Sequence, residues 1–466
     1  MPEASRNEPF RGAALFKPVD AASLAAFRIG FGVLLAAGLT RFLAEGWVSV
    51  LFVEPSFFFK YWGFAWVPEP PAGVMYALYG TLCLLALAFA AGLQFRIVAV
   101  LLFLGFSWVE LIDVTNYLNH YYLVSLLLLL STFLPLGWTW SVDARRRPER
   151  ARDTVPAWVL YLLRFQVGVV YLYAGFAKVG GDWLLHAQPL GIWLAARDEL
   201  PILGAWFTNG WVPYLVSWAG FLFDSSIVLF LSWRRTRALA FAAVLVFHTG
   251  THLLFDIGLF PFLMPLAATI FFSPDWPRRL LSRIASSAPA RPVARANLDV
   301  VGWTPRRRWL AVPIVGYVAL QALLPLRFLA YGGDVLWHEQ GMRWSWKVMV
   351  REKNGSIDYR VRNAETGREW QVGPMRYLTW RQANEMTGQP DLILQLAHHI
   401  AEDFADRGLG PVEVRVDALV SLNGRRAARL IDPSADLTRV RDGVAPAGWI
   451  LPRNDEPPLR VVHRMS

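Results

Sequence analysis

Lys178 ends a long apolar stretch, residues 155–177, and lies in the run Ala-Gly-Phe-Ala-Lys-Val-Gly-Gly-Asp-Trp that finishes at Trp183. A lysine at the boundary of the hydrocarbon is partly desolvated, and desolvation disfavours its charged form. An amine that loses its proton near neutral pH can serve as a base. The alternative interpretation is a lysine whose ammonium extends to the lipid head groups.

Other polar side chains interrupt the apolar stretches, and each is unfavourable there unless it is paired or faces a cavity. They are Arg28, Glu110, Asp113, Asn116, Asn119, His120, Arg164, Asp224, His248 and His252. If the C-terminal region lies outside the cell, seven polar residues fall near the outer ends of their helices. They are Asp113, Asn119, His120, Lys178, Asp182, His252 and Asp256. Such a layer predicts a site that accepts a proton from an acidic, membrane-soluble substrate. Polar contacts that tie helices together are the alternative.

His248 and His252 have the i, i+4 spacing that puts two side chains on one helical face, which is also a spacing of metal ligands. No glutamate lies between them in the zincin arrangement, and no third ligand is nearby in sequence. We therefore expect no metal. Phosphate-binding glycine loops, nucleophile elbows and Cys-x-x-Cys motifs are absent from the sequence.

The composition predicts an integral membrane protein, because 55% hydrophobic and 14% aromatic residues over 466 positions exceed what a soluble domain carries. About nine apolar runs have the length of a membrane span. They are residues 22–44, 72–93, 96–112, 117–137, 156–178, 211–232, 236–255, 257–273 and 309–330. The connections at 45–71 and 179–210 are rich in Trp, Phe and Pro, which is typical of interfacial helices.

Lysine and arginine concentrate in alternate connections, which predicts a cytoplasmic N terminus and an odd number of spans. Residues 1–273 then form a membrane domain with eight spans, 274–308 a basic cytoplasmic linker, 309–330 the last span and 331–466 an extracytoplasmic domain. Alternating residues at 356–361 and 412–422, and a helical spacing at 380–407, predict that the last domain is α+β and rich in β structure.

Several segments, in this order, resemble the vitamin K-dependent γ-glutamyl carboxylase family, whose membrane part is also called the horizontally transferred transmembrane (HTTM) domain. They are Ala-Ser-Leu-Ala-Ala-Phe-Arg (22–28), Asn119-His120-Tyr-Tyr, Trp-Ser-Val-Asp (140–143), Val170 to Lys178 with Asp182-Trp183, Phe247-His248, Ile-Gly-Leu-Phe-Pro (257–261), Ser-Pro-Asp-Trp-Pro-Arg-Arg (273–279), Trp-Ser-Trp-Lys-Val-Met-Val (344–350), Val-Ser-Leu-Asn (420–423) and Ile-Asp-Pro (431–433). The resemblance covers roughly residues 18 to 440.

This resemblance implies a carboxylase that is also an epoxidase. In the family, a lysine that matches Lys178 deprotonates reduced vitamin K, O2 adds, and a strongly basic quinone alkoxide results. The alkoxide removes a γ-proton from a glutamyl side chain, CO2 adds, and the quinone leaves as its 2,3-epoxide. A glutamyl protein or peptide on the outer face is the expected partner. The rival hypotheses are a quinol epoxidase with another acceptor or none, and a non-catalytic quinone- or lipid-binding protein.

The resemblance also suggests roles for particular residues. Lys178 is the expected base, and His120 with Asn119 is expected to orient the quinol or assist carboxylation. We expect His248, His252, Met349 and Trp183 to line the quinone site, and Arg164, Asp113 and Asp182 to support it. The single cysteine, Cys83, allows no intrachain disulfide, which favours a bacterial inner-membrane protein with menaquinol as an alternative hydroquinone.

Overall fold

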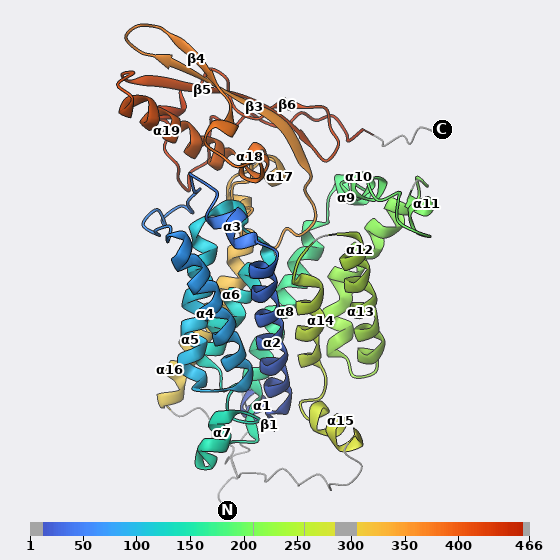
Figure 1. Cartoon of the computed structure of the whole chain (residues 1–466). Helices are drawn as coiled ribbons and strands as arrows, with labels where there is room; N and C mark the ends of the chain where they lie inside the picture. The colour runs from blue at the N-terminus through green and yellow to red at the C-terminus, as the bar shows by residue number, and fades with distance from the viewer. Residues whose placement is uncertain (1–12, 208, 256, 285–304, 460–466) are drawn as a thin grey trace, which may run out of the picture.

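The computed structural model describes residues 13–207, 209–255, 257–284 and 305–459. A bundle of apolar helices carries the C-terminal domain at one end (Figure 1), which we call the domain-side end. Asp256 and much of the predicted linker 274–308 lie outside the described residues. The described parts of that segment form the ends of two helices, α15 (Trp276–Ile284) and α16 (Pro305–Leu323).

Seven helices in the described part of the chain are long and apolar enough to cross a membrane. They are α2 (Ala22–Ala44), α4 (Ala72–Ala91), α5 (Phe95–Ile112), α8 (Ala157–Ala177), α12 (Val212–Ser232), α13 (Arg237–Leu254) and α16, which continues into the 3-10 helix η4 (Leu324–Ala330). The protein is therefore a polytopic helical membrane protein, as the sequence predicts.

Two shorter apolar helices occupy the remaining predicted spans, so the count of nine stays a prediction. They are α6 (Asn119–Phe133) and α14 (Phe260–Ala268), the latter followed by the 3-10 helix η3 (Thr269–Phe271). The carboxylate of Asp113 accepts hydrogen bonds from the backbone and hydroxyl of Thr115, which starts a 3-10 turn, η1 (Val114–Asn116), and delays the start of α6. Pro135 disfavours the helical conformation at Leu134, which ends α6.

The helices pack in two groups that meet at α14. In one group α2 contacts α4, α4 contacts α5 and α5 contacts α6; in the other, α8 contacts α12, α12 contacts α13 and α13 contacts α14. α14 also packs against α2 and α8, and α16 packs against α8 (Figure 1). Because α8 packs against α12, α14 and α16, a side chain at its domain-side end can meet residues from several helices.

Short elements connect the long helices. They are α1 (Ala13–Phe16), β1 (Pro18–Asp20), α3 (Trp47–Phe52), α7 (Val142–Arg146), η2 (Pro148–Arg150), β2 (Thr154–Pro156), α9 (Gly181–Leu184), α10 (Leu190–Ala195) and α11 (Gly204–Phe207). Strands β1 and β2 pair antiparallel at the end of the bundle opposite the C-terminal domain. The Trp-rich connections 45–71 and 179–210 contain short helices at the domain-side end, in agreement with the sequence prediction.

The C-terminal domain is an α+β fold built on a four-stranded antiparallel sheet of order β4-β3-β5-β6. Its elements are α17 (Val335–His338), β3 (Lys353–Asn363), β4 (Glu369–Val372), η5 (Pro374–Arg376), α18 (Trp380–Thr387), α19 (Pro390–Asp406), β5 (Val412–Leu422), β6 (Ala428–Arg429) and η6 (Leu437–Arg439). Alternate residues of β3 and β5 are buried against the helices, which is the period-2 pattern seen in the sequence. The predicted helix 380–407 is divided at Gly388 and Pro390.

The two parts of the protein share side chains across their interface. Phe59 and Tyr61 of the first long connection are buried in the core of the C-terminal domain. In the opposite direction, Trp346 is buried in the core of the helical bundle and stacks on Tyr122, with ring centroids 4.9 Å apart. The C-terminal domain is therefore packed into the bundle rather than attached by a linker alone.

Arg28 is a buried structural cation at the opposite end of the bundle. Its guanidinium is fully buried and donates to the carbonyl oxygens of Ala90, Leu136, Thr139 and Trp140 at 2.6 to 3.3 Å. These carbonyls follow the ends of α4 and α6, where backbone acceptors have no partner within a helix. Arg28 therefore joins three segments of the chain.

Replacing Arg28 by Met should lower the stability of the bundle, because four buried carbonyl groups lose their donor at about 1 to 3 kcal/mol for each group left unsatisfied. We expect a clear fall in the thermal unfolding temperature of the purified protein in detergent. Arg96→Met is the control, since Arg96 has one exposed hydrogen bond, to the Thr132 carbonyl. Equal effects of the two substitutions would contradict this role for Arg28.

Candidate functional site

Lys178 caps the C-terminal end of α8 and is paired with Asp224 of α12. Its Nζ atom lies 2.7 Å from Oδ2 of Asp224 and 3.1 Å from the carbonyl oxygen of Ala174. Only 4% of Lys178 and 7% of Asp224 is exposed. The interpretation of Lys178 as a cation that extends to the lipid head groups is therefore wrong for this structure, because the amine is held inside the protein.

Lys178 and Asp224 form a buried ion pair. The carboxylate 2.7 Å from the Nζ atom stabilises the ammonium form of the lysine. A neutral amine can keep both contacts as well, because its two hydrogen atoms suffice for the two acceptors, Asp224 and the Ala174 carbonyl. Asp224 is thus the counter-ion of Lys178.

Trp183 covers the other side of Lys178. Its ring centroid lies 5.1 Å from the Nζ atom, within the range of a cation–π interaction. The indole N–H donates to the carbonyl of Ser217 on α12 at 2.8 Å, and the hydroxyl of Ser217 donates back to the Trp183 carbonyl. Trp183 is 5% exposed, so it helps to exclude water from the amine.

Deeper along the same face of α8, Tyr171 contacts His248 of α13. Two turns separate Tyr171 from Lys178, and a spacing of seven residues repeats the same helical face. The Tyr171 hydroxyl and the Nε2 atom of His248 are 3.0 Å apart, while Nδ1 of His248 is buried without a hydrogen-bond partner among the described residues. The rings of Phe223 and Phe260 lie 6.2 and 5.5 Å from His248.

His120 approaches the same aromatic wall from α6. Its ring is 6.1 Å from Phe260, and its buried Nε2 atom has no partner in the described part of the structure. Both amide atoms of the buried Asn116 likewise have none there. Asn119 differs, because its Oδ1 atom accepts a hydrogen bond from the hydroxyl of Tyr117 at 3.1 Å. Phe260 therefore contacts both His120 and His248, two of the three histidines that the sequence analysis assigned to the site.

The segment after α17 contributes Met349 in a strained backbone conformation. Trp344, Trp346 and Met349 have positive φ angles of 62°, 56° and 57°. Such angles are unfavourable for residues other than glycine and concentrate at functional sites. The backbone N–H of Trp344 donates to the Tyr117 hydroxyl at 2.8 Å, which links this segment to Asn119.

Asp182 does not lie with Lys178 as a second carboxylate of the site. Its carboxylate is held by Arg425 through two hydrogen bonds and by Asn423 at 2.9 Å. Burial acts to raise the pKa of Asp182, but the bonds from Arg425 and Asn423 outweigh it and hold this pKa below its ordinary value. Asp182 is thus a point of attachment for the C-terminal domain.

Asp113 has a similar attachment role, since Gln382 donates to its Oδ2 atom at 2.8 Å.

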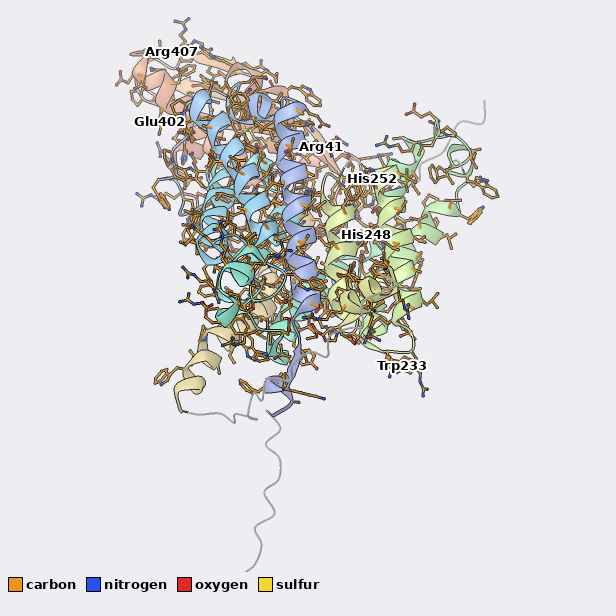
Figure 2. The ribbon with its side chains drawn as sticks, turned by 60° about the horizontal axis from the view of Figure 1, so that its bottom comes forward. Arg41, Trp233, His248, His252, Glu402 and Arg407 are labelled. Carbon is orange, nitrogen blue, oxygen red and sulfur yellow. The ribbon has the colours of Figure 1, made fainter. Side chains whose placement is uncertain are left out.

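His252 lies on α13 nearer to the C-terminal domain than His248 (Figure 2). Its side chain is exposed and packs on Phe262 at a ring distance of 5.0 Å, so it is not brought to the buried site. The expectation that His252 lines the quinone site came from its position within the family motifs, and the exposure of its side chain on α13 does not agree with it.

Arg164 does not pair with an intramembrane carboxylate. It donates to the backbone carbonyls of Ile270, Phe271 and Phe272 at 2.9 to 3.4 Å. These carbonyls lie in and directly after η3, at the C-terminal end of the helical segment that begins with α14, where backbone acceptors lack a helical partner. Arg164 therefore joins α8 to the end of η3, which is a structural role.

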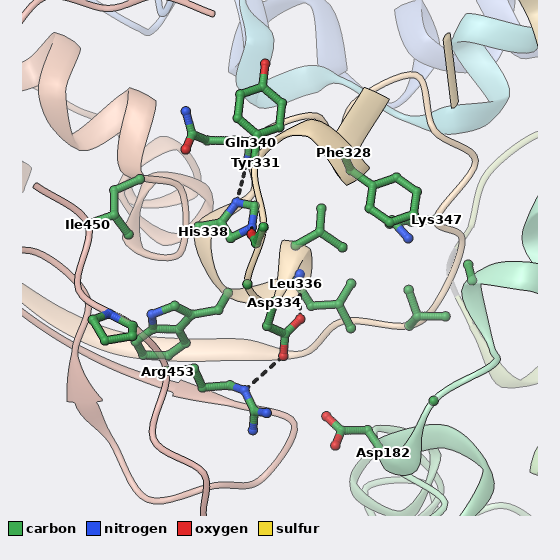
Figure 3. Close-up of a pocket in the computed structure, with 18 of the residues that line it drawn as sticks. Asp182, Phe328, Tyr331, Asp334, Leu336, His338, Gln340, Lys347, Ile450 and Arg453 are labelled. Atoms are coloured by element: carbon green, nitrogen blue, oxygen red, sulfur yellow. Dashed lines mark hydrogen bonds and ion pairs between the residues drawn. The ribbon is translucent and has the colours of Figure 1, made fainter. Parts of the chain in front are cut away.

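A cavity of about 970 Å³ lies between the end of α8 and the C-terminal domain. Trp183 is among its lining residues, and Asp182 forms part of its wall (Figure 3). Also in the wall, Arg453 pairs with Asp334 at 2.9 Å, and its Nη1 atom has no hydrogen-bond partner among the described residues. Trp183 thus contacts both this cavity and Lys178, which is absent from the cavity lining.

Lys347 is a second cation in the wall of this cavity. Its Nζ atom lies over the ring of Phe328, 3.8 Å from the centroid (Figure 3). It has no carboxylate within ion-pair distance among the described residues. Burial lowers the pKa of Lys347 to about 8, and the charge of Asp334 opposes this shift only in part. The cavity therefore contains a cation that can receive a carboxylate.

Sequence reasoning missed three parts of the site. Asp224 was recognised as a polar residue in a span but was not connected to Lys178, and Tyr171 and Phe260 were seen only inside longer motifs. Tyr171 could have been found from its spacing of seven residues to Lys178. Within the described residues no group of three His, Cys, Asp or Glu side chains could hold a metal ion.

The fold and the site define a polytopic membrane protein with a buried lysine–aspartate pair, two buried histidines and a large α+β domain at one end. Residues 16–276 match the HTTM domain family, and residues 306–456 match the family described as vitamin K-dependent gamma-carboxylase, lumenal domain. No solved structure matches the chain. The chain belongs to the vitamin K-dependent γ-glutamyl carboxylase family, which is a family of enzymes, and its C-terminal region is the extracytoplasmic domain of that family.

The Lys178–Asp224 pair should behave as one unit in stability measurements. Lys178→Met and Asp224→Leu each leave one buried charge without its partner, which should destabilise the protein by about 3 to 5 kcal/mol. The double variant removes both charges, so its loss should be smaller than either single loss. Thermal unfolding of the four proteins in detergent gives the comparison, and additive losses would contradict the pairing.

Proposed function

We propose that the protein is a carboxylase and epoxidase that uses reduced vitamin K, or menaquinol, with O2 and CO2. It couples oxygenation of the hydroquinone to removal of a γ-proton from a glutamyl residue and addition of CO2 to the resulting carbon. The observation that carries this proposal is the buried Lys178 amine, which has Asp224 as its counter-ion and lies in a bundle with the unpartnered atoms of His120 and His248.

The overall reaction balances in atoms and electrons. The hydroquinone, when bound, supplies the driving force, because it loses two hydrogen atoms and gains one oxygen atom as the 2,3-epoxide while the second oxygen atom of O2 leaves as water. In the glutamyl residue one C–H bond is replaced by a C–C bond to CO2, and the displaced γ-hydrogen is released overall as a proton. A γ-proton is far too weak an acid for any side chain of this protein to remove without that oxidation.

Lys178 accepts the first proton, from a hydroxyl of the hydroquinone. In its neutral form the amine keeps its hydrogen bonds to Asp224 and the Ala174 carbonyl through its two hydrogen atoms, and its lone pair takes that proton. Asp224 then stabilises the ammonium. Because both groups are shielded from water, their interaction is stronger than it would be in solution. Removal of Asp224 should therefore lower the proton affinity of Lys178 and also lower the stability of the fold.

The residues around Phe260 fit a flat aromatic ring with oxygen atoms at its edges. Phe260, Phe223 and Tyr171 supply aromatic surfaces, and the unpartnered nitrogen atoms of His120 and His248 supply hydrogen-bonding groups for hydroxyl or carbonyl oxygens. We assign His120, assisted by Asn119, to orient the quinol oxygens. Met349 and Trp183 complete the lining, and His252 is assigned no contact with the ring.

The glutamyl substrate enters from the cavity at the domain-side end. Lys347 and the free Nη1 atom of Arg453 are suitable partners for its carboxylate groups. Trp183 contacts both this cavity and Lys178. This arrangement gives the lipid-soluble and the peptide substrates separate approaches to one site. We place the protein in a bacterial inner membrane with a cytoplasmic N terminus.

Purified wild-type protein with reduced vitamin K and O2 should form the epoxide, and Lys178→Ala should form none. Menaquinol should be tested in parallel. With a glutamyl peptide and labelled bicarbonate, the wild type should also incorporate label into the peptide. Arg96→Met is the control, since Arg96 is hydrogen-bonded to the Thr132 carbonyl and does not touch the buried pair. If the folded wild-type protein forms no epoxide with either quinol, the proposal is contradicted. If it forms epoxide but no glutamyl peptide takes up label, the protein is a quinol epoxidase and not a carboxylase.

The apparent KM for the glutamyl peptide should rise as the pH increases from about 7 to about 9. Lys347 has a pKa of about 8, so its ammonium is present below that value and is lost above it, while the substrate carboxylate stays ionised throughout. A rise of about fivefold corresponds to roughly 1 kcal/mol of binding energy. In Lys347→Arg the guanidinium stays charged over this range, so the rise should disappear. An unchanged pH profile in that variant would exclude Lys347 as the carboxylate partner.

A further inference from the structure

The turn after β5 reaches from the C-terminal domain into the segment that follows the catalytic lysine. The Arg425 guanidinium binds the Asp182 carboxylate with both Nη atoms, and the Nη1–Oδ2 distance is 2.6 Å. Its Nε atom donates to the carbonyl of Glu456 at 2.8 Å. Two parallel bonds to one carboxylate fix both position and orientation. Arg425 is 7% exposed, so water competes little for this pair.

Asn423 reinforces the same contact. It is fully buried, and its Nδ2 atom donates to Asp182 and to the carbonyl of Val350. Its Oδ1 atom accepts from the backbone N–H of Glu352 at 2.8 Å. The turn at residues 422–425 therefore connects Asp182 to the start of β3 and to the segment that carries Met349.

The chain between Lys178 and Asp182 does not by itself determine where Trp183 lies. Gly180 and Gly181 are two of the three residues between Lys178 and Asp182, and a side chain at either position would meet nothing within 4 Å. Glycine restricts the backbone less than any other residue. The position of Trp183 over Lys178 consequently depends on contacts made from outside: Ser217 on one side and, through Asp182, Arg425 on the other.

We propose that Arg425 is a positioning residue for Lys178, acting through Asp182 and Trp183. By holding Asp182, Arg425 keeps the indole over the amine and in the wall of the cavity of about 970 Å³. The C-terminal domain thereby controls the surroundings of the base in addition to receiving the peptide. This inference rests on the proposed function, in which Lys178 is the base.

The kinetic test compares Arg425→Gln, Trp183→Leu and the double variant in the full-length protein. A base displaced by about 1 Å can lose up to about 100-fold in rate. We expect Arg425→Gln to lower kcat for epoxide formation by about 10- to 100-fold, with a smaller change in the KM for the quinol, because the aromatic contacts of Phe260, Phe223 and Tyr171 are retained. The double variant should be no slower than Trp183→Leu alone, since Arg425 affects Lys178 only through the position of Trp183. Multiplicative losses would overturn the proposal.

A second readout does not depend on activity. A small, water-soluble reagent that reacts with amines should modify Lys178 at least about tenfold faster in Arg425→Gln than in the wild type. The rate is measured by mass spectrometry of the peptide that contains Lys178. A tenfold change in rate corresponds to a loss of about 1.4 kcal/mol in the shielding of the amine. Gln395→Ala is the matched control, since Gln395 also bridges the two parts of the protein, through the backbone N–H and carbonyl of Lys60. It should leave the modification of Lys178 unchanged.

If Arg425→Gln does not fold, Asp182→Asn provides the same test from the membrane side, because it keeps the shape and removes the charge. Unchanged modification of Lys178 in whichever of these two variants folds, or equal acceleration in Gln395→Ala, would overturn the proposal. If the wild type forms no epoxide, the proposed function fails, and the modification experiment still decides whether Arg425 positions Lys178.

Discussion

The structure depends on a buried ion pair in a part of the protein from which water is excluded. The Asp224 carboxylate, 2.7 Å from the Nζ atom of Lys178, stabilises the lysine ammonium. A lone buried charge would be strongly unfavourable. The contacts between α8 and α12, and the position of Trp183 and Ser217 beside the pair, serve to maintain it.

Around this pair the protein separates two kinds of surface. Toward the bundle, aromatic rings and nitrogen atoms of His120 and His248 that have no partner among the described residues suit a lipid-soluble quinol. Toward the C-terminal domain, a cavity that contains Lys347 suits a carboxylate. The strained segment that carries Trp346 and Met349 crosses from one surface to the other. A membrane enzyme with one hydrophobic and one water-soluble substrate requires such a boundary.

The sequence predicted those features that depend on local pattern. Lys178, His120 and His248 were identified because polar residues in apolar runs are rare, and β5 was predicted at residues 412–422 from its alternation. Contacts between distant segments were not predictable: Asp224 is 46 residues from Lys178, and Arg425 is 243 residues from Asp182. The periodicity of a helix identifies its buried face but not its partner. His252 was assigned from its position within the family motifs, and that assignment does not agree with the structure, because α13 is covered at His248 and exposed one turn later.

The most direct test of this account is a cryo-electron microscopy structure of the protein with reduced vitamin K, prepared without oxygen. The account predicts the ring against Phe260, with one oxygen atom within hydrogen-bonding distance of Lys178 and the other facing His120 or His248. A ring bound elsewhere, with Lys178 still covered by Trp183 and paired only with Asp224, would contradict the assignment of Lys178 as the base.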